Sequence, residues 1–261
     1  MSGYPEKKVS EKRRKEITSL KRSTYRDRHD AFLVEGARSI RAALTARADV
    51  LELLIAPSAI DSSIGDEAAR AGAQVLSISN RELSRISNVS VSQGLLLVAR
   101  RKKVSPEEML IRKSVLILDG IQDPGNVGTL VRTAAWFGVE AVLSGPETAD
   151  FFNPKVVRSS MGGIWDVDLA TSESLSSWIS SYRELDARIY AADLSGESVY
   201  DWTPAHPSAM VIGSEAHGLS EAVRGAIDSS VCIPGVRRAT QSLNASVAGG
   251  VIISAWVRGI R

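Results

Sequence analysis

The second half of the chain contains five short apolar runs whose apolar residues are consecutive instead of alternating with polar ones. They are "SVLILDG" (114–120), "EAVLSG" (140–145), "ARIYAADL" (187–194), "SAMVIGSE" (208–215) and "SSVCIPG" (229–235). An unbroken apolar strand is typical of a parallel sheet that is covered by helices on both faces. Helical patterns fall between some of these runs, and an apolar segment at 246–260 predicts a buried terminal helix. We therefore expect an α/β domain with a parallel sheet over residues 114–261.

The first half of the chain predicts a smaller α/β domain over residues 29–100. Its strands are expected at 31–36, 50–57, 74–79 and 93–100, and its helices at 37–46, 66–73 and 80–87. The charged stretch 101–113 contains Pro106 and no sustained apolar stripe, so it is expected to be a linker with one short helix.

Residues 1–28 are strongly basic. They contain ten Lys and Arg and four acidic residues, whereas the whole chain has a net charge of +2, so the remainder is slightly acidic. A basic arm on an acidic body is the pattern of a tail that binds a polyanion such as RNA. A solvated helix or a disordered end gives the same composition, and both alternatives stay open.

Composition excludes several other classes of protein. The single cysteine, Cys232, cannot form an internal disulfide, so nothing indicates an oxidising compartment. The longest nearly apolar run, 246–257, is too short to span a bilayer, and the N-terminus lacks the apolar core of a secretory signal. We expect a cytoplasmic protein without a membrane partner. No cluster of His, Cys and acidic residues has metal-ligand spacing, so no metal is expected.

The stretch "LDGIQDPGNVGTLVRTAAWFG" (118–138) joins a strand to a helix through a glycine loop. It lacks the Lys and Ser/Thr of a P-loop, and its Gly125 and Gly128 match a dinucleotide fingerprint poorly. Asn126 is the expected N-cap of the helix, and Gly138 its C-cap. Arg132 falls on the polar side of the helix, where it is either functional or simply solvated.

Two further stretches place polar residues beside glycine turns. "MVIGSEAHGLS" (210–220) puts Glu215 at the carboxyl end of a strand, where open α/β sheets bind ligands. "CIPGVRRATQSLNASVAGG" (232–250) puts Ser242 and Asn244 before the terminal helix. An ordinary turn carboxylate and two helix caps are the alternative interpretations of these residues.

Together these stretches resemble the SpoU (TrmH-like) family of RNA ribose methyltransferases. The matching blocks are "DPGNVGTLVRTAAWFG", "MVIGSEAHGLS" and "IPGVRRATQSLNASVA", with "NPKVVRSSMGGIW" (153–165) between the first two. "FLVEGARSIRAAL" (32–44) and "SQGLLLVA" (92–99) resemble the substrate-binding domain that often precedes the family's catalytic domain. One departure is the loop before Ser-Leu-Asn, which is longer than the family's and carries Arg237 and Arg238.

The resemblance implies a trefoil-knotted methyltransferase domain that acts as a homodimer on RNA, with S-adenosyl-L-methionine as methyl donor. Carried over by motif position, the implied catalytic residues are Asn126, Arg132, Glu215, Ser242 and Asn244. The implied cofactor-binding residues are Gly213, Ile233 and Leu243.

The expected reaction is methylation of a ribose 2′-hydroxyl in structured RNA, most simply ribosomal RNA. The same reaction on transfer RNA and a non-catalytic role in ribosome assembly are the alternatives, and the modified nucleotide cannot be named from the sequence. A guanidinium stays protonated at neutral pH, so Arg132 is expected to stabilise the developing alkoxide or a neighbouring phosphate. Glu215 is expected to hold Arg132 as an ion pair, and His217 is interpreted as a turn residue.

Overall fold

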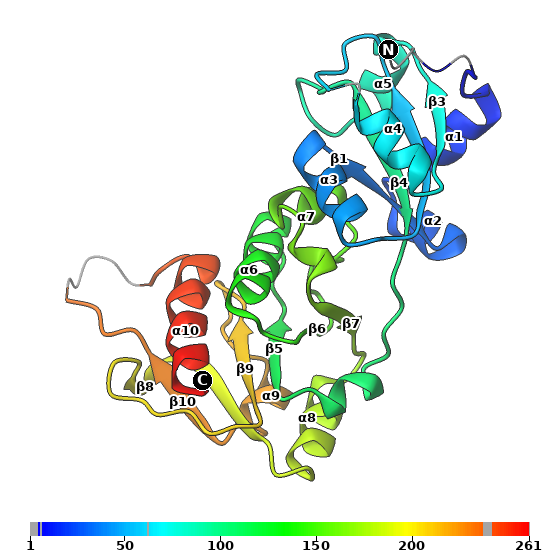
Figure 1. Cartoon of the computed structure of the whole chain (residues 1–261). Helices are drawn as coiled ribbons and strands as arrows, with labels where there is room; N and C mark the ends of the chain where they lie inside the picture. Colours follow the sequence, from blue (N-terminus) through cyan, green and yellow to red (C-terminus); the bar gives the residue numbers. More distant parts are fainter. Residues whose placement is uncertain (1–4, 6, 62, 237–241, 261) are drawn as a thin grey trace. The chain divides into compact units, whose positions relative to one another are not determined.

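The computed structural model describes residues 5, 7–61, 63–236 and 242–260. Its contacts divide the chain into two compact units, which Figure 1 shows in sequence colours. Unit 1 comprises Met1–Lys102 with Asp150–Trp165, and unit 2 comprises Lys103–Ala149 with Asp166–Arg261. The segment 150–165 thus groups with the N-terminal unit, although it lies within the range 114–261 expected for the second domain. The domain boundaries expected from the sequence, at residues 29–100, 101–113 and 114–261, remain a prediction.

Unit 1 contains a four-stranded sheet with the order β1-β4-β2-β3. Strand β4 runs antiparallel to β1 and β2, while β2 and β3 are parallel. The strands are β1 (Ala31–Glu35), β2 (Val50–Ile55), β3 (Gln74–Ser77) and β4 (Leu95–Arg100). The helices are α1 (Glu11–Ser19), α2 (Ser23–His29), α3 (Ala37–Thr45), α4 (Ser63–Arg70), α5 (Asn80–Ile86) and α7 (Pro154–Ser159). The strands and helices expected from the sequence between residues 31 and 100 are all present.

Helices α1 and α5 cover one face of this sheet. Ile17 of α1 and the C-cap residue Leu20 are buried in one apolar cluster with the strands and with Leu83 and Ile86 of α5. Helix α5 starts with a capping box, in which the Ser79 hydroxyl and the Glu82 carboxylate each bind the other residue's backbone N–H.

Much of the basic N-terminal stretch is folded into unit 1. Arg13 pairs with Glu52, Arg14 with Glu82, and Lys15 with Glu11. Arg26 is buried and pairs with Asp150, and Lys21 donates to carbonyls at the end of α5. Five of the ten basic side chains make no ion pair or side-chain hydrogen bond to the described residues: Lys7, Lys8, Lys12, Arg22 and Arg28.

Aromatic packing attaches the segment 150–165 to the sheet of unit 1. The ring of Phe32, on β1, lies 4.8 Å from that of Phe152 and 5.6 Å from that of Trp165, centroid to centroid. Gly162 has a φ of +100°, and a Cβ at this position would lie 2.6 Å from the Cβ of Ala42. Only glycine therefore allows this close approach to α3.

Unit 2 is built on a six-stranded sheet with the order β10-β8-β9-β5-β6-β7. Every pair of neighbours is parallel, which confirms the expectation drawn from the unbroken apolar runs. The strands are β5 (Ser114–Asp119), β6 (Ala141–Ser144), β7 (Asp168–Thr171), β8 (Arg188–Ser198), β9 (Ser208–Gly213) and β10 (Ser229–Cys232). The edge strand β7 was not expected from the sequence.

Helices cover both faces of this sheet. Helices α8 (Leu175–Arg183) and α9 (Glu221–Arg224) pack on Val115 and Ile117 of β5. Helices α6 (Pro124–Phe137) and α10 (Ala245–Ile260) lie side by side (Figure 1), and α10 also contacts β9. A Cβ on Gly249 of α10 would lie 2.3 Å from the Leu130 side chain of α6, so glycine permits this close helix packing.

The expected linker 101–113 is largely packed into unit 2. Its short helix is the 3₁₀ turn Glu107–Ile111, in which Met109 is buried. Trp178 Nε1 donates to Pro106 O at 2.7 Å, and the Tyr182 hydroxyl donates to Arg112 O at 2.5 Å. Burial, with a smaller effect of Glu140, raises the pKa of Tyr182, so this hydroxyl stays protonated as a donor. No helix in the described part of the chain is long and apolar enough to cross a membrane.

Candidate functional site

Helix α6 begins directly after β5, at the carboxyl edge of the unit 2 sheet. Its N-cap is Asp123, whose carboxylate accepts hydrogen bonds from the backbone N–H groups of Gly125 (2.7 Å) and Asn126 (3.0 Å). The expectation that Asn126 caps the helix is therefore wrong. Pro124 occupies the first helical position, which suits its fixed φ and missing N–H. The Asn126 side chain, in the first turn, is left available for other contacts, and Gly138 closes the helix as expected.

Glu215 lies in a tight turn that follows β9. Backbone hydrogen bonds of 2.9 and 2.8 Å join Ser214 to Gly218 in both directions, so the intervening residues project from the sheet edge. Gly213 must be glycine in this arrangement, because a Cβ there would lie 2.5 Å from the backbone of Gly218. The sequence thus places an exposed carboxylate on a fixed turn at the carboxyl end of a central strand.

Asn244 has two roles at the start of α10. Its Oδ1 accepts from the backbone N–H groups of Ser246 (3.0 Å) and Val247 (3.3 Å), which is the hydrogen-bond pattern of an N-cap. Its Nδ2 donates to Glu215 Oε1 at 2.8 Å and to Asn126 Oδ1 at 3.1 Å. The predicted cap is therefore confirmed, and the same side chain also contacts Glu215 and Asn126, while its assignment to an active site stays a prediction.

Glu215 is the centre of this cluster. Its Oε1 accepts from Asn126 Nδ2 at 3.0 Å, from Asn244 Nδ2 at 2.8 Å and from the backbone N–H of Ala245 at 2.7 Å. Charged acceptors make the stronger kind of hydrogen bond, so one carboxylate oxygen fixes the starts of both α6 and α10. Residues from three separate sequence blocks are thereby held together.

The remaining two predicted catalytic residues do not join this cluster. Arg132 is exposed on α6 and forms no hydrogen bond or ion pair with any described residue. The expected Glu215–Arg132 ion pair is therefore absent from the described part of one chain. Asn126, which does bind Glu215, and Arg132 also lie at different heights on α6, because a step of six residues along a helix spans about 9 Å. Ser242 is exposed two residues before Asn244.

The predicted cofactor residues lie at the end of β9 and on loops at the same edge of the sheet. Gly213 ends β9, and Ile233 follows β10 and is half-buried. Leu243 is 45% exposed and directly precedes Asn244. Arg237 and Arg238 lie outside the described residues. Within the described ranges, no three His, Cys, Asp or Glu side chains are arranged to hold a metal ion.

Sequence reasoning missed two carboxylates that shape this edge. Asp123 has the signal of a cap, because an Asp directly before Pro commonly starts a helix. Asp119 ends β5, is 6% exposed, and accepts a hydrogen bond of 2.7 Å from the backbone N–H of Ser220. Its position at the carboxyl end of a buried strand was the available signal.

Comparison with protein families and solved structures gives the same assignment for both units. Residues 113–254 match the SpoU rRNA Methylase family, and residues 11–97 match the MRM3-like substrate binding domain. The 23S rRNA (guanosine(2553)-2′-O)-methyltransferase RlmP of Bacillus subtilis is 29% identical over 92% of this chain and 93% of its own. An uncharacterized tRNA/rRNA methyltransferase of Mycolicibacterium smegmatis is 32% identical, over 73% of this chain and 63% of its own.

Solved structures also match nearly the whole chain. A TrmH-family protein from Porphyromonas gingivalis superposes with a TM-score of 0.81 and 31% identity, covering 96% of this chain and 98% of its own. The SpoU methyltransferase AviRb of Streptomyces viridochromogenes, solved with AdoMet, gives a TM-score of 0.85 and 25% identity, covering 95% and 98%. The family match spans more than half of the chain and contains the Asn126–Glu215–Asn244 cluster. The chain belongs to the SpoU rRNA methylase family.

Proposed function

We propose that the protein transfers a methyl group from S-adenosylmethionine to a ribose 2′-hydroxyl of ribosomal RNA in the cytoplasm. The observation that carries this proposal is the hydrogen-bonded cluster of Asn126, Glu215 and Asn244 at the carboxyl edge of a parallel sheet, in a SpoU-family chain. The B. subtilis relative, which is named for this reaction on 23S rRNA, aligns over nearly the whole chain and so supports the choice of substrate.

The residues at the ends of β9 and β10 fit the cofactor chemically. Ile233 and Leu243 offer apolar, accessible surface for an adenine ring, and Gly213 keeps the neighbouring turn close to the sheet. S-adenosylmethionine, when bound, supplies a methyl group that is already activated by the sulfonium. The protein must then orient the 2′-oxygen and stabilise the charge that develops as its proton leaves.

Hydrogen-bond capacity separates the roles of the three clustered residues. Asn244 uses both amide hydrogens on Glu215 and Asn126 and uses its oxygen as the cap of α10, so it is a positioning residue. Asn126 uses one amide hydrogen on Glu215 and keeps the other. Glu215 Oε2 has no donor among the described residues. We assign Asn126 and Glu215 to the ribose, with the Ser242 hydroxyl as a donor to a flanking phosphate.

Arg132 is assigned to charge stabilisation. A guanidinium cannot act as an ordinary base near neutral pH, but it can stabilise the developing alkoxide or orient a phosphate that accepts the proton. Two unit charges about 4 Å apart interact by roughly 4 kcal/mol at an effective dielectric of about 20. If realised only in the transition state, that interaction gives about a thousandfold in rate.

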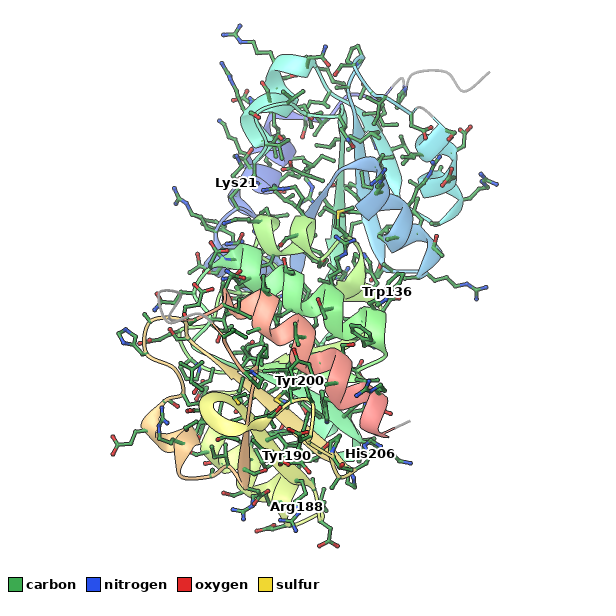
Figure 2. The ribbon with its side chains drawn as sticks, turned by 90° about the vertical axis from the view of Figure 1, so that its left-hand side faces the viewer. Lys21, Trp136, Arg188, Tyr190, Tyr200 and His206 are labelled. Carbon is green, nitrogen blue, oxygen red and sulfur yellow. The ribbon has the colours of Figure 1, made fainter. Side chains whose placement is uncertain are left out.

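A second copy of the chain explains how Arg132 reaches a site. Trp136 lies one helical turn after Arg132, on the same face of α6, and is 83% exposed (Figure 2). On the neighbouring helix α10, Val247 and Val251 are 53% and 38% exposed and also share a face. Exposed apolar residues on paired helices are typical of an interface. We propose that these two helices form a homodimer interface that carries Arg132 to the cluster of the partner chain.

We assign RNA binding to unit 1. It carries the match to a substrate binding domain, and Lys7, Lys8, Lys12, Arg22 and Arg28 are its unpaired cations among the described residues 7–28. Contacts with phosphates release counterions, so affinity should fall steeply with salt. Replacing Lys12, Arg22 and Arg28 together by Ala should weaken RNA binding and reduce the salt slope. An unchanged slope would remove these cations from the interface.

The decisive test maps 2′-O-methylation in ribosomal and transfer RNA from cells with and without the gene. The proposal predicts loss of a ribosomal RNA methylation, restored by the wild-type gene and by Arg188→Ala, but not by Arg132→Ala. Arg188 is a matched control because it is an exposed arginine at the start of β8 (labelled in Figure 2), at the amino edge of the sheet and not at the carboxyl edge that bears the site. Loss of a transfer RNA methylation alone would reassign the substrate, and no loss in either RNA would favour a non-catalytic assembly role.

A further inference from the structure

A cavity of about 410 Å³ lies within unit 2, at the carboxyl edge of the sheet. Its walls come from the loops that follow β5, β6, β7 and β9, from the start of α8 and from α9, and none of the residues assigned above to catalysis or to the cofactor lines it. Its polar lining includes Asp119, Gln122, Glu147, Glu173, His217 and Ser220. The volume falls within the range of small-ligand sites and is sufficient for one nucleobase.

The charge of this cavity excludes one class of occupant. Three carboxylates, Asp119, Glu147 and Glu173, line it, and no Lys or Arg among the residues that the structure describes does so. A phosphate group would be repelled by such a lining, whereas a group rich in N–H donors would find acceptors. The occupant is therefore a donor-rich group without a phosphate of its own in the cavity.

Asp119 supplies an acceptor that is already fixed in place. Asp119 is only 6% exposed, and its Oδ2 accepts a hydrogen bond from the backbone N–H of Ser220. Its Oδ1 has no hydrogen-bond donor among the described residues, and Asp119 lines the cavity. Because this oxygen is open to the cavity and is not itself fully buried, a ligand N–H that replaces water there makes a charge-assisted hydrogen bond.

The cavity shares its two main loops with the candidate active site. Gln122 directly precedes Asp123, which starts the helix that bears Asn126. Ser214 and His217 flank Glu215 in the turn after β9. A group in the cavity would therefore lie close to the ribose that these loops are proposed to bind. On an RNA substrate, the nearest group that lacks charge is a base.

We propose that this cavity binds a guanine base of the RNA, either that of the methylated nucleotide or that of its neighbour. Guanine presents two adjacent donors, N1–H and the 2-amino group, on its Watson–Crick edge, and carboxylates are their complement. Uracil presents a single donor between two acceptors, and adenine and cytosine each pair one donor with acceptors, so they match this lining less well. Reading an unstacked base by its Watson–Crick edge is a common mode of RNA recognition. The assignment rests on the proposed function, since it presupposes an RNA substrate.

The test uses the full-length protein with methyl-labelled Leu and Val, titrated with the RNA trinucleotides UGU, UIU, UAU and UCU. Leu175 and Val223 line the cavity, so their methyl signals report its occupancy. UGU should shift both signals, with an affinity at least fivefold above that of UIU, whose inosine lacks the 2-amino group. Glu173→Gln should lower UGU affinity at least threefold. Glu184→Gln, at the other end of the same helix, should not change it.

Several outcomes would overturn the assignment. Equal responses to all four trinucleotides would remove the preference for guanine, and an absence of shifts at both methyl positions would remove the site. Shifts caused by S-adenosylmethionine alone would make the cavity part of the cofactor site. Failure of the proposed function would be seen in a different experiment. Cellular RNA would keep all its methylations in cells without the gene, while the purified protein would still respond to UGU.

Discussion

The side chains of Asn126 and Asn244 are joined by a hydrogen bond of 3.1 Å, although they are 118 residues apart. The first belongs to the opening turn of α6 and the second caps α10, and both also donate to the same oxygen of Glu215. A substitution at this point therefore has two separable effects, one on the stability of a helix start and one on the geometry of the cluster.

Replacing Asn244 in two ways should separate those effects. Asn244→Ala removes the cap of α10 and should lower the free energy of unfolding by about 1 kcal/mol. Asn244→Asp keeps an acceptor for the cap, but it places a second carboxylate beside Glu215 and removes the donated hydrogen bonds. We expect the repulsion between the two carboxylates to lower stability although the cap is kept, together with at least a tenfold loss of methyl transfer, measured by urea unfolding and by transfer from labelled cofactor to RNA. Full activity in Asn244→Asp would contradict the positioning role.

Arg132→Ala should lower kcat for methyl transfer by about a thousandfold while changing KM little, because the lost interaction is confined to the transition state. Arg132→Lys should recover only part of the rate, since an ammonium lacks the planar fork of a guanidinium. Single-turnover transfer to ribosomal RNA is the measurement, with Arg188→Ala as the control. A variant that turns over normally but binds RNA weakly would assign Arg132 to anchoring.

Trp136→Glu should convert the proposed dimer to a monomer, because it places a charge on the exposed apolar face shared by α6 and α10. Loss of activity should accompany dissociation, since Arg132 would no longer reach the partner's site. Sedimentation velocity gives the mass directly. Leu185→Glu is the matched control, as Leu185 is an exposed leucine (53%) just after α8. A wild-type protein that sediments as a monomer would reject the dimer outright.

Asp193 should contribute stability in a pH-dependent way. Hydrogen bonds from Ser195, first from its backbone and then from its hydroxyl, together with Arg224, lower the pKa of Asp193 below its ordinary value of 3.8. A depressed folded-state pKa gives stability that is fully present above the unfolded value and is lost as pH falls through the folded value. Asp193→Ala should therefore cost roughly 0.5–1 kcal/mol at pH 7, with solvent screening limiting the effect. Urea unfolding should show this difference shrinking below about pH 4, and a constant difference would contradict it.

The sequence predicted those elements whose signals are local. Unbroken apolar runs identified β5, β6, β8, β9 and β10 and their parallel arrangement. Helix α8 was missed although Leu175, Trp178, Ile179 and Tyr182 are buried at helical spacing, because serines surround them and obscure the stripe. The sequence also could not predict that the segment 150–165 packs on the N-terminal sheet, since that depends on contacts such as Phe32 with Phe152.

For the candidate site, motif position correctly brought together Asn126, Glu215 and Asn244, but it did not predict their partners. Residue type after the Pro-Gly turn suggested that Asn126 caps α6, and opposite charge suggested that Glu215 pairs with Arg132. The cap is instead Asp123, which precedes the proline, and this leaves the Asn126 amide free to bind Glu215. Such choices between competing hydrogen bonds depend on the meeting of distant segments, which one-dimensional spacing does not describe.

Arg26 provides a test of how the segment 150–165 is held in unit 1. Its guanidinium is 3% exposed, donates to the carbonyls of Leu20 and Lys21, each at 2.9 Å, and pairs with Asp150. Arg26→Ala leaves these two carbonyls without their donor, while Asp150 is 33% exposed and stays hydrated, so the change should cost about 1–3 kcal/mol in unfolding free energy. Lys15→Ala, which breaks an exposed pair with Glu11, should cost less than about 0.5 kcal/mol.

The double variant distinguishes an ion pair from simple packing at Arg26. If Asp150 mainly neutralises the buried guanidinium, Arg26→Ala combined with Asp150→Ala should lose less stability than the sum of the losses in Arg26→Ala and in Asp150→Ala. Additive losses, measured by the same urea titrations, would instead mean that the two side chains stabilise unit 1 independently. The guanidinium would then act through its two backbone carbonyls, and the attachment of residues 150–165 would depend on the Phe32, Phe152 and Trp165 rings.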